Sequence, residues 1–149
     1  MKRLISVGFA LTLLVCVGCA PSKPQTQPVT GKVMFKKSQP AAGALIVFHP
    51  VHADFEKRIG GKPTCRKVSD DGTYRLSMFE DGDGAPEGDY GVTIQWEAKP
   101  KEGKLSLGSE GAPAGRSMIN EAKYGNPQKP FTKVTVKKGE KNEFNFDVD

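Results

Sequence analysis

The sequence predicts an all-β fold, a seven-stranded β-sandwich, and three observations support this prediction. From residue 29 onward, apolar and polar residues alternate along several segments, which is the period of a strand with one buried face. The chain of 149 residues contains 17 Gly and 11 Pro, more than an average domain has, and both residue types favour turns. The alternating segments number about seven, each of roughly 5–9 residues, as in many sandwiches.

The first two predicted strands are residues 29–36 and 44–50, joined by turn residues 38–43. The inward face of the first carries Val29, Val33 and Phe35. The second strand, ALIVFHP, is apolar on both faces and β-branched in the middle, so we expect a central strand that is buried on both sides. Residues 51–62 are polar and contain glycine, and we expect an irregular connection there.

Three more strands are predicted before residue 98. Residues 63–68 form a weaker strand, and Ser69–Gly72 form a tight turn, because Asp tolerates turn geometry and Gly accepts positive φ. In the strand of residues 73–79 the predicted inward side chains are Tyr74, Leu76 and Met78. The strand that starts at Asp89 is predicted to bury Tyr90, Val92, Ile94 and Trp96.

The last two strands follow a long loop, residues 98–131. Loops of this length are usually functional or mobile, and residues 117–124 within it could form one or two helical turns with Ser117 as N-cap. The strand TKVTVKK then places Val134 and Val136 inward, and NEFNFDVD places Phe144, Phe146 and Val148 inward. We expect the letters KGEK to join these two strands as a hairpin.

The acidic stretch DGDGAPEG presents two alternatives, a metal site or a bend. Asp81, Asp83 and Asp89 are the candidate ligands, but a calcium loop starting at Asp81 would have Pro86 where glycine is needed and Val92 where the bidentate Glu is needed. A bend explains the glycines and the proline, so we expect a bend. A weak calcium site of another type at 81–89 remains an alternative.

Other reactive side chains give weaker signals. His49 and His52 have H-x-x-H spacing without a third ligand nearby in the sequence, so we expect histidines at a strand end rather than a metal site. Cys65 is the one cysteine of the predicted domain, without a C-x-x-C partner, and we expect a strand residue rather than a catalytic thiol. No G-x-S-x-G motif is present. We therefore expect no enzyme, no catalytic or metal-binding residues and no cofactor.

The charge of the chain does not indicate nucleic-acid binding. The formal net charge is +5 at pH 7, and the excess Lys and Arg residues are spread over the sequence. A nucleic-acid-binding surface usually has a denser basic face with interleaved aromatic residues. We expect a mildly basic, solvated surface.

The N-terminal 28 residues differ from the rest of the chain. Lys2 and Arg3 form a positive start, and Leu4–Val17 is an apolar segment about as long as the core of a secretory signal peptide. It is short for a membrane-spanning helix, which needs roughly 20 apolar residues. We expect a signal-peptide helix, followed by a polar, flexible tether at residues 19–28 and a β-sandwich at residues 29–149.

The letters CVGC, Cys16 to Cys19, resemble the lipobox of bacterial lipoproteins, in which a small residue precedes a cysteine. The resemblance implies cleavage after Gly18, which removes a signal peptide of residues 1–18, and attachment of lipid to Cys19. Cys16 stands where the family usually has Leu. The alternatives are an ordinary secretory signal with a coincidental cysteine, or a cytoplasmic protein with a buried apolar helix.

The residue after the lipobox cysteine bears on location. It is Ala20 rather than Asp, which by analogy with well-studied bacteria favours the outer membrane, facing the periplasm, over the inner membrane. Several acyl chains would hold the protein stably on the bilayer, whereas one chain binds only marginally.

Five motifs of the remaining chain carry a second resemblance: G-x-V at Gly31, GA at Gly43, DG-x-Y at Asp71, GDGAP-x-G-x-Y at Gly82 and KYGNP at Lys123. In these the chain resembles small lipoproteins of planctomycete-type bacteria with a transthyretin-like or carboxypeptidase-regulatory-like domain. The resemblance implies a seven-stranded Greek-key sandwich and no known activity. A hydrolase family of the transthyretin-like fold ends in YRGS, whereas this chain ends in FDVD, so that activity is not expected.

Together these features predict a lipid-anchored, non-enzymatic module of the bacterial cell envelope that is structural or binds a protein. Its expected partners are the membrane and an envelope protein, with no nucleic acid and no small-molecule substrate. The alternative is an accessory module that binds a glycan or a peptide. Sandwich domains bind glycans through exposed aromatic side chains, whereas alternation places the single tryptophan, Trp96, inward.

Overall fold

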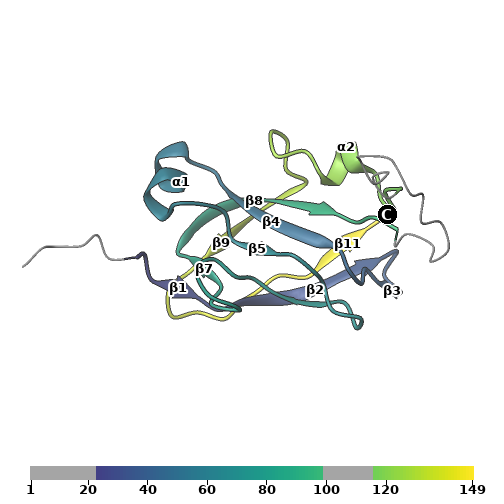
Figure 1. Ribbon diagram of the computed structural model, residues 1–149, viewed down its shortest axis with the longest axis horizontal. Helices are drawn as coiled ribbons and strands as arrows, with labels where there is room; N and C mark the ends of the chain where they lie inside the picture. Colours follow the sequence, from purple (N-terminus) through teal and green to yellow (C-terminus); the bar gives the residue numbers. More distant parts are fainter. Residues whose placement is uncertain (1–22, 99–115) are drawn as a thin grey trace, which may run out of the picture.

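The computed structural model describes residues 23–98 and 116–149, and most regular structure in them is β-strand. The strands form two principal sheets that lie one above the other, with a short helix at each end of the molecule (Figure 1). The predicted all-β class is confirmed. The predicted signal-peptide helix lies outside the described residues.

The first sheet is centred on strand β2 (Val29–Phe35). On one side β2 pairs antiparallel with β3 (Gln39–Pro40) and β6 (Thr73–Arg75). On the other side it pairs parallel with β10 (Asn142–Glu143) and β11 (Phe146–Val148). Strand β2 therefore brings together the beginning, the middle and the end of the domain.

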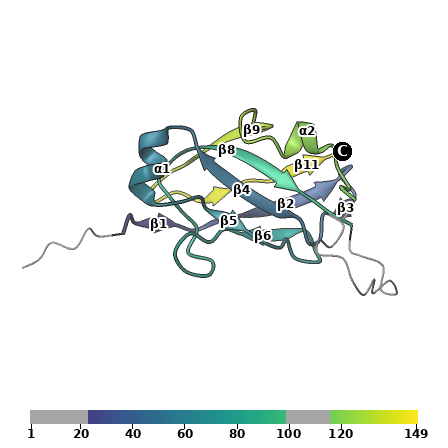
Figure 2. The same ribbon diagram turned by 45° about the horizontal axis from the view of Figure 1, so that its top comes forward.

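The second sheet is antiparallel throughout, in the order β5-β4-β8-β9. Its strands are β5 (Thr64–Cys65), β4 (Leu45–Pro50), β8 (Gly88–Gln95) and β9 (Thr132–Val136). The two long central strands, β4 and β8, cross the molecule side by side (Figure 2). Strands β5 and β9 are the two edges of this sheet.

A third, two-stranded sheet lies at the N-terminal end of the described chain. Strand β1 (Thr26–Gln27) pairs antiparallel with β7 (Ala85–Pro86). The predicted flexible tether of residues 19–28 is therefore wrong for Thr26–Gln27, because these residues are held in a sheet. This pairing could not be predicted from the residues around Thr26, because the partner strand lies almost sixty residues further along the chain.

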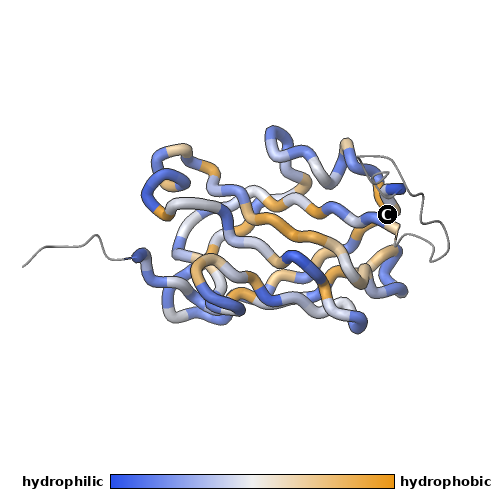
Figure 3. Tube along the Cα trace, in the orientation of Figure 1, coloured by the Kyte–Doolittle hydropathy of each residue, from blue (hydrophilic) through white to orange (hydrophobic). Residues whose placement is uncertain are grey.

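The hydrophobic core is a cluster of buried residues drawn largely from the strands of the two principal sheets, and hydrophobic positions recur along these strands (Figure 3). Alternation predicted its members correctly along β8, where Tyr90, Val92 and Ile94 are fully buried and Trp96 just beyond the strand is 6% exposed. Phe48 of β4 packs on Phe146 of the first sheet, with ring centroids 6.4 Å apart. Each large side chain buried in this way contributes about 1.5–3 kcal/mol relative to an exposed one.

The hairpin predicted for the letters KGEK is wrong. Strand β9 pairs with β8 in the second sheet, whereas β10 and β11 pair with β2 in the first. The connection therefore crosses from one sheet to the other. The Asn142 side chain stabilises it by accepting a hydrogen bond from Lys137 N and donating to Lys137 O and Glu140 O.

The irregular connection predicted for residues 51–62 is also wrong, because it contains helix α1 (Ala53–Ile59). Phe55 and Ile59, four residues apart, are buried on one helix face. Asp54 and Glu56 lie in the first turn, and Gly60 ends the helix in the left-handed conformation at φ 77°.

Three smaller differences concern turns and the second helix. Helix α2 (Glu121–Tyr124) has Asn120 as its N-cap, accepting from Lys123 N, whereas Ser117 lies earlier in a β-bridge with Glu97. The connection after β2 contains two turns, residues 36–38 and 42–43, on either side of β3. The first begins at Lys36 and Lys37, both at positive φ, so the predicted turn residues 38–43 also include a short strand. In β4 alternate residues beginning with Leu45 are only half-buried, so this strand is buried on one face rather than on both.

Candidate functional site

The acidic stretch of residues 81–89 forms a bend that enters β8. Gly82 and Gly84 adopt positive φ, 71° and 91°, which only glycine adopts without strain. The Asp83 carboxylate accepts hydrogen bonds from Met78 N at 2.6 Å and Phe79 N at 3.0 Å. The predicted bend is confirmed, and Asp83 holds it closed.

The three aspartates of this stretch have different partners. Asp81 makes one long contact, 3.4 Å, with the Ser77 hydroxyl, and Asp89 accepts from Thr135 Oγ1 at 2.6 Å on β9. Within residues 23–98 and 116–149, no three His, Cys, Asp or Glu side chains come together in a group that could hold a metal ion.

The two histidines lie at the junction of β4 and α1. His49 Nε2 is 2.8 Å from Thr93 Oγ1 on the neighbouring strand. Burial, together with the positive charge of Lys62, lowers the His49 pKa from its ordinary value of 6.5, and Glu56 partly opposes the change. His52 is exposed and is the N-cap residue of α1, but its side chain makes no capping hydrogen bond.

Cys65 is a strand residue, as predicted, and its side chain is 7% exposed. Tyr74 of β6 lines the same surface hollow as Cys65 and donates a hydrogen bond to Phe144 O at 2.8 Å. Burial raises the Tyr74 pKa well above its ordinary value. At neutral pH the phenol is therefore a fixed structural donor rather than an acid or a base.

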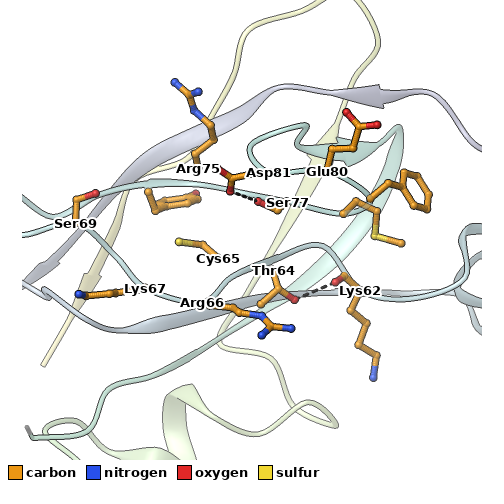
Figure 4. Close-up of a pocket in the computed structure, with 13 residues that line it drawn as sticks. Lys62, Thr64, Cys65, Arg66, Lys67, Ser69, Arg75, Ser77, Glu80 and Asp81 are labelled. Carbon is orange, nitrogen blue, oxygen red and sulfur yellow. Dashed lines mark hydrogen bonds between the residues drawn. The ribbon is translucent and has the colours of Figure 1, made fainter.

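An open hollow in the described surface lies between β5 and β6, at the junction of the two principal sheets. It has a volume of about 790 Å³ and is open to solvent. Figure 4 shows its two walls, with Arg66 and Lys67 on one, Arg75 on the other, and the Cys65 side chain between them. We call this hollow the basic groove.

Hydrogen bonds join the walls of the basic groove at its two ends only. At one end Thr64 and Ser77 exchange a pair of backbone hydrogen bonds, 2.9 and 3.0 Å long. At the other end Ser69 N donates to Thr73 O at 2.9 Å. Between these two closures, the described residues form no backbone hydrogen bond across the groove.

The register of β6 shows which backbone groups face the groove. Val33 N donates to Gly72 O and Leu76 N donates to Val29 O, and Tyr74 pairs with Gly31 midway between them. Because hydrogen-bonded pairs alternate in an antiparallel ladder, the N–H and C=O of Arg75 point away from β2 and toward β5. Both groups therefore lie in the groove.

The side chains of the groove give it a positive charge. Four cationic residues line it, against two acidic ones: Lys62, Arg66, Lys67 and Arg75, and Glu80 and Asp81. Lys62 forms an ion pair with Glu56 on α1 at 3.4 Å. The ion pairs of the described chain include none from Arg66, Lys67 or Arg75. In the sequence these charges are scattered, because the groove brings together two segments about ten residues apart.

Cys19, the predicted lipid-attachment residue, lies outside the described residues. The two described helices are short, and neither has the length and apolar character needed to cross a bilayer. Compared with protein-family models, curated proteins and solved structures, the chain gives no match.

Proposed function

We propose that this protein is a lipoprotein of the bacterial cell envelope, anchored through Cys19, whose β domain is a non-enzymatic protein-interaction module. The outer membrane, on its periplasmic side, is the proposed location. The domain is proposed to be a transthyretin-like Greek-key sandwich. The facing sheets support this proposal, and so does the crossover from β9 to β10, which leaves one sheet for the other.

The observation that carries the proposal is the combination of the leader motif with the placement of β1. The pairing of β1 with β7 fixes the chain at one end of the domain. The opposite end carries α2 and the C-terminus (Figure 1). A domain anchored just before β1 would direct the end with α2 and the C-terminus away from the membrane. The edge strands β5 and β9 of the second sheet would then be accessible to a partner.

The burial of aromatic side chains favours a protein ligand over a glycan. Trp96 is buried, and its indole N–H donates to Ala42 O at 2.9 Å. The exposed large hydrophobic residues of the described chain are Val51 and Met118, neither of which is aromatic. A glycan-binding surface would need an exposed aromatic platform. A glycan array with the detergent-solubilised protein tests this choice, and a specific glycan hit would favour the alternative.

The anchoring proposal is tested with Cys19→Ala. The wild-type protein should incorporate labelled palmitate and partition into the detergent phase, because acyl chains transfer favourably from water. Cys19→Ala should do neither. Cys16→Ala is the matched control and should still be acylated, since the lipid is proposed to sit on Cys19. Absence of label from the wild-type protein would show that lipidation is wrong.

A further inference from the structure

We propose that the basic groove between β5 and β6 binds a short acidic segment of a partner polypeptide in an extended conformation. This inference rests on the proposed interaction function and names its site and the chemistry of the partner. It combines two independent features of the groove, the unpaired backbone groups of its walls and the charge of its side chains.

The backbone of the groove offers the hydrogen bonds of a sheet edge. Arg75 directs both its N–H and its C=O into the groove, and Arg66 and Lys67 on the opposite wall form no backbone hydrogen bond among the described residues. An extended peptide carries donors and acceptors on both sides of its backbone and can pair with such an edge. The closures at Thr64–Ser77 and Ser69–Thr73 limit this pairing to a few residues.

The side chains determine the charge of the occupant. Arg66 and Arg75 stand on opposite walls, and neither forms an ion pair with another described residue (Figure 4). An arginine fork binds a carboxylate through two parallel hydrogen bonds. In an extended peptide alternate side chains project to the same side, roughly 7 Å apart. Carboxylates at alternate positions would therefore lie on one face of the bound peptide, where each can pair with an arginine of either wall.

The backbone carbonyls distinguish a peptide from a simple anion. A phosphate or the headgroup of an anionic lipid such as phosphatidylglycerol could accept hydrogen bonds from the arginines and from Arg75 N, but it lacks the adjacent backbone N–H and C=O groups that pair with both Arg75 N and Arg75 O. A peptide satisfies both the donor and the acceptor. We therefore assign the groove to an acidic polypeptide rather than to an anionic membrane surface.

The test measures fluorescence anisotropy of a labelled eight-residue peptide, with Glu and Val alternating, on the full-length protein in detergent. We expect saturable binding that weakens with added salt. The double variant Arg66→Ala/Arg75→Ala should weaken binding by about tenfold or more, because two charge-assisted contacts are removed. The matched control Lys129→Ala/Lys138→Ala removes the same charge from exposed positions outside the groove and should stay within about twofold of wild type.

A second peptide separates backbone pairing from charge alone. The same sequence with every amide N-methylated keeps every carboxylate and loses the N–H groups, so it should bind about tenfold more weakly if the groove pairs with the peptide backbone. Equal binding of both peptides would overturn the proposal in favour of a simple anion site. Competition by millimolar inorganic phosphate, or capture by phosphatidylglycerol vesicles with no binding of the peptide, would overturn it as well.

Failure of the groove proposal can be told apart from failure of the proposed function. If the wild-type protein is acylated and pulls down an envelope protein that the arginine double variant retains equally, the anchored interaction module stands and the groove assignment is wrong. If neither acylation nor a protein partner is found, the proposed function itself is wrong.

Discussion

Gly31 of β2 lies so close to the backbone of Phe144 that a Cβ added to Gly31 would stand 1.8 Å from the Phe144 carbonyl oxygen. The same oxygen accepts the hydrogen bond of the Tyr74 hydroxyl at 2.8 Å. Phe144 N in turn donates to Thr30 O at 2.9 Å. The approach of these two residues therefore fixes β6 and the C-terminal strands on either side of β2.

Gly31→Ala should destabilise the domain by about 2–4 kcal/mol, because the Phe144 backbone has to move and two hydrogen bonds are disturbed. The free energy of unfolding in urea measures the effect. Gly139→Asn is the matched control. Gly139 has φ 74° and open space around the added Cβ, and Asn tolerates this conformation, so the change should be below about 1 kcal/mol. Equal losses in the two variants would contradict the packing argument.

Asp83→Ala should cost about 1–3 kcal/mol, because the Met78 and Phe79 amides lose their acceptor. Asp81→Ala, which removes only a 3.4 Å contact, should stay within about 0.5 kcal/mol of wild type. Thermal unfolding of the two variants gives the comparison. Added Ca²⁺ should leave the melting temperature of the wild-type protein unchanged, and a rise abolished by Asp83→Ala would instead support the calcium alternative.

Asn142→Asp should destabilise the protein by about 3 kcal/mol at pH 7, because the side chain is 5% exposed and faces the Lys137 and Glu140 carbonyl oxygens. This environment should raise the pKa of the new carboxyl group, so the lost stability should partly return as the pH falls and the group becomes a donor. Urea unfolding at pH 5 and pH 7 tests this.

Asn126→Asp is the control for that substitution. Asn126 is exposed, and its Oδ1 accepts from Gln128 N, a role that a carboxylate also fills. Its unfolding free energy should change by less than about 0.5 kcal/mol. Similar losses at both positions would show that the Asn142 hydrogen bonds do not stabilise the crossover.

Along β8 the sequence was sufficient to predict which side chains are buried, but it did not predict which strands pair. Alternation is a local property, so Tyr90, Val92 and Ile94 could be assigned to the core without knowing their neighbours. Pairing is not local. Phe146 follows β9 by only ten residues, and yet its strand pairs with β2 at the other end of the domain. The hairpin was wrong for this reason.

Helix α1 and the basic groove were missed for different reasons. The helix had a signal, since Phe55 and Ile59 stand four residues apart, the first turn is acidic and Gly60 follows the last residue. Its seven residues nevertheless resemble a polar loop in composition. The groove had no local signal. It exists because the walls that carry Arg66 and Arg75 belong to two different sheets that separate between two closures.

His49 should make the stability of the protein fall as the pH drops below about 6.5. Folding lowers the His49 pKa, mainly through burial and then through Lys62, so between the folded and unfolded pKa values the unfolded chain binds more protons. Stability is therefore complete above the unfolded value and is lost as the pH falls toward the folded one. His49→Gln, which can still hydrogen-bond Thr93, should lose this part of the pH dependence, whereas His52→Gln should keep it.

The measurement is the unfolding free energy in urea from pH 5 to pH 8. Each variant is compared with wild type by difference, because the carboxylates titrate equally in all three proteins. A His49→Gln curve parallel to wild type over this range would show that the half-buried imidazole does not couple folding to protonation.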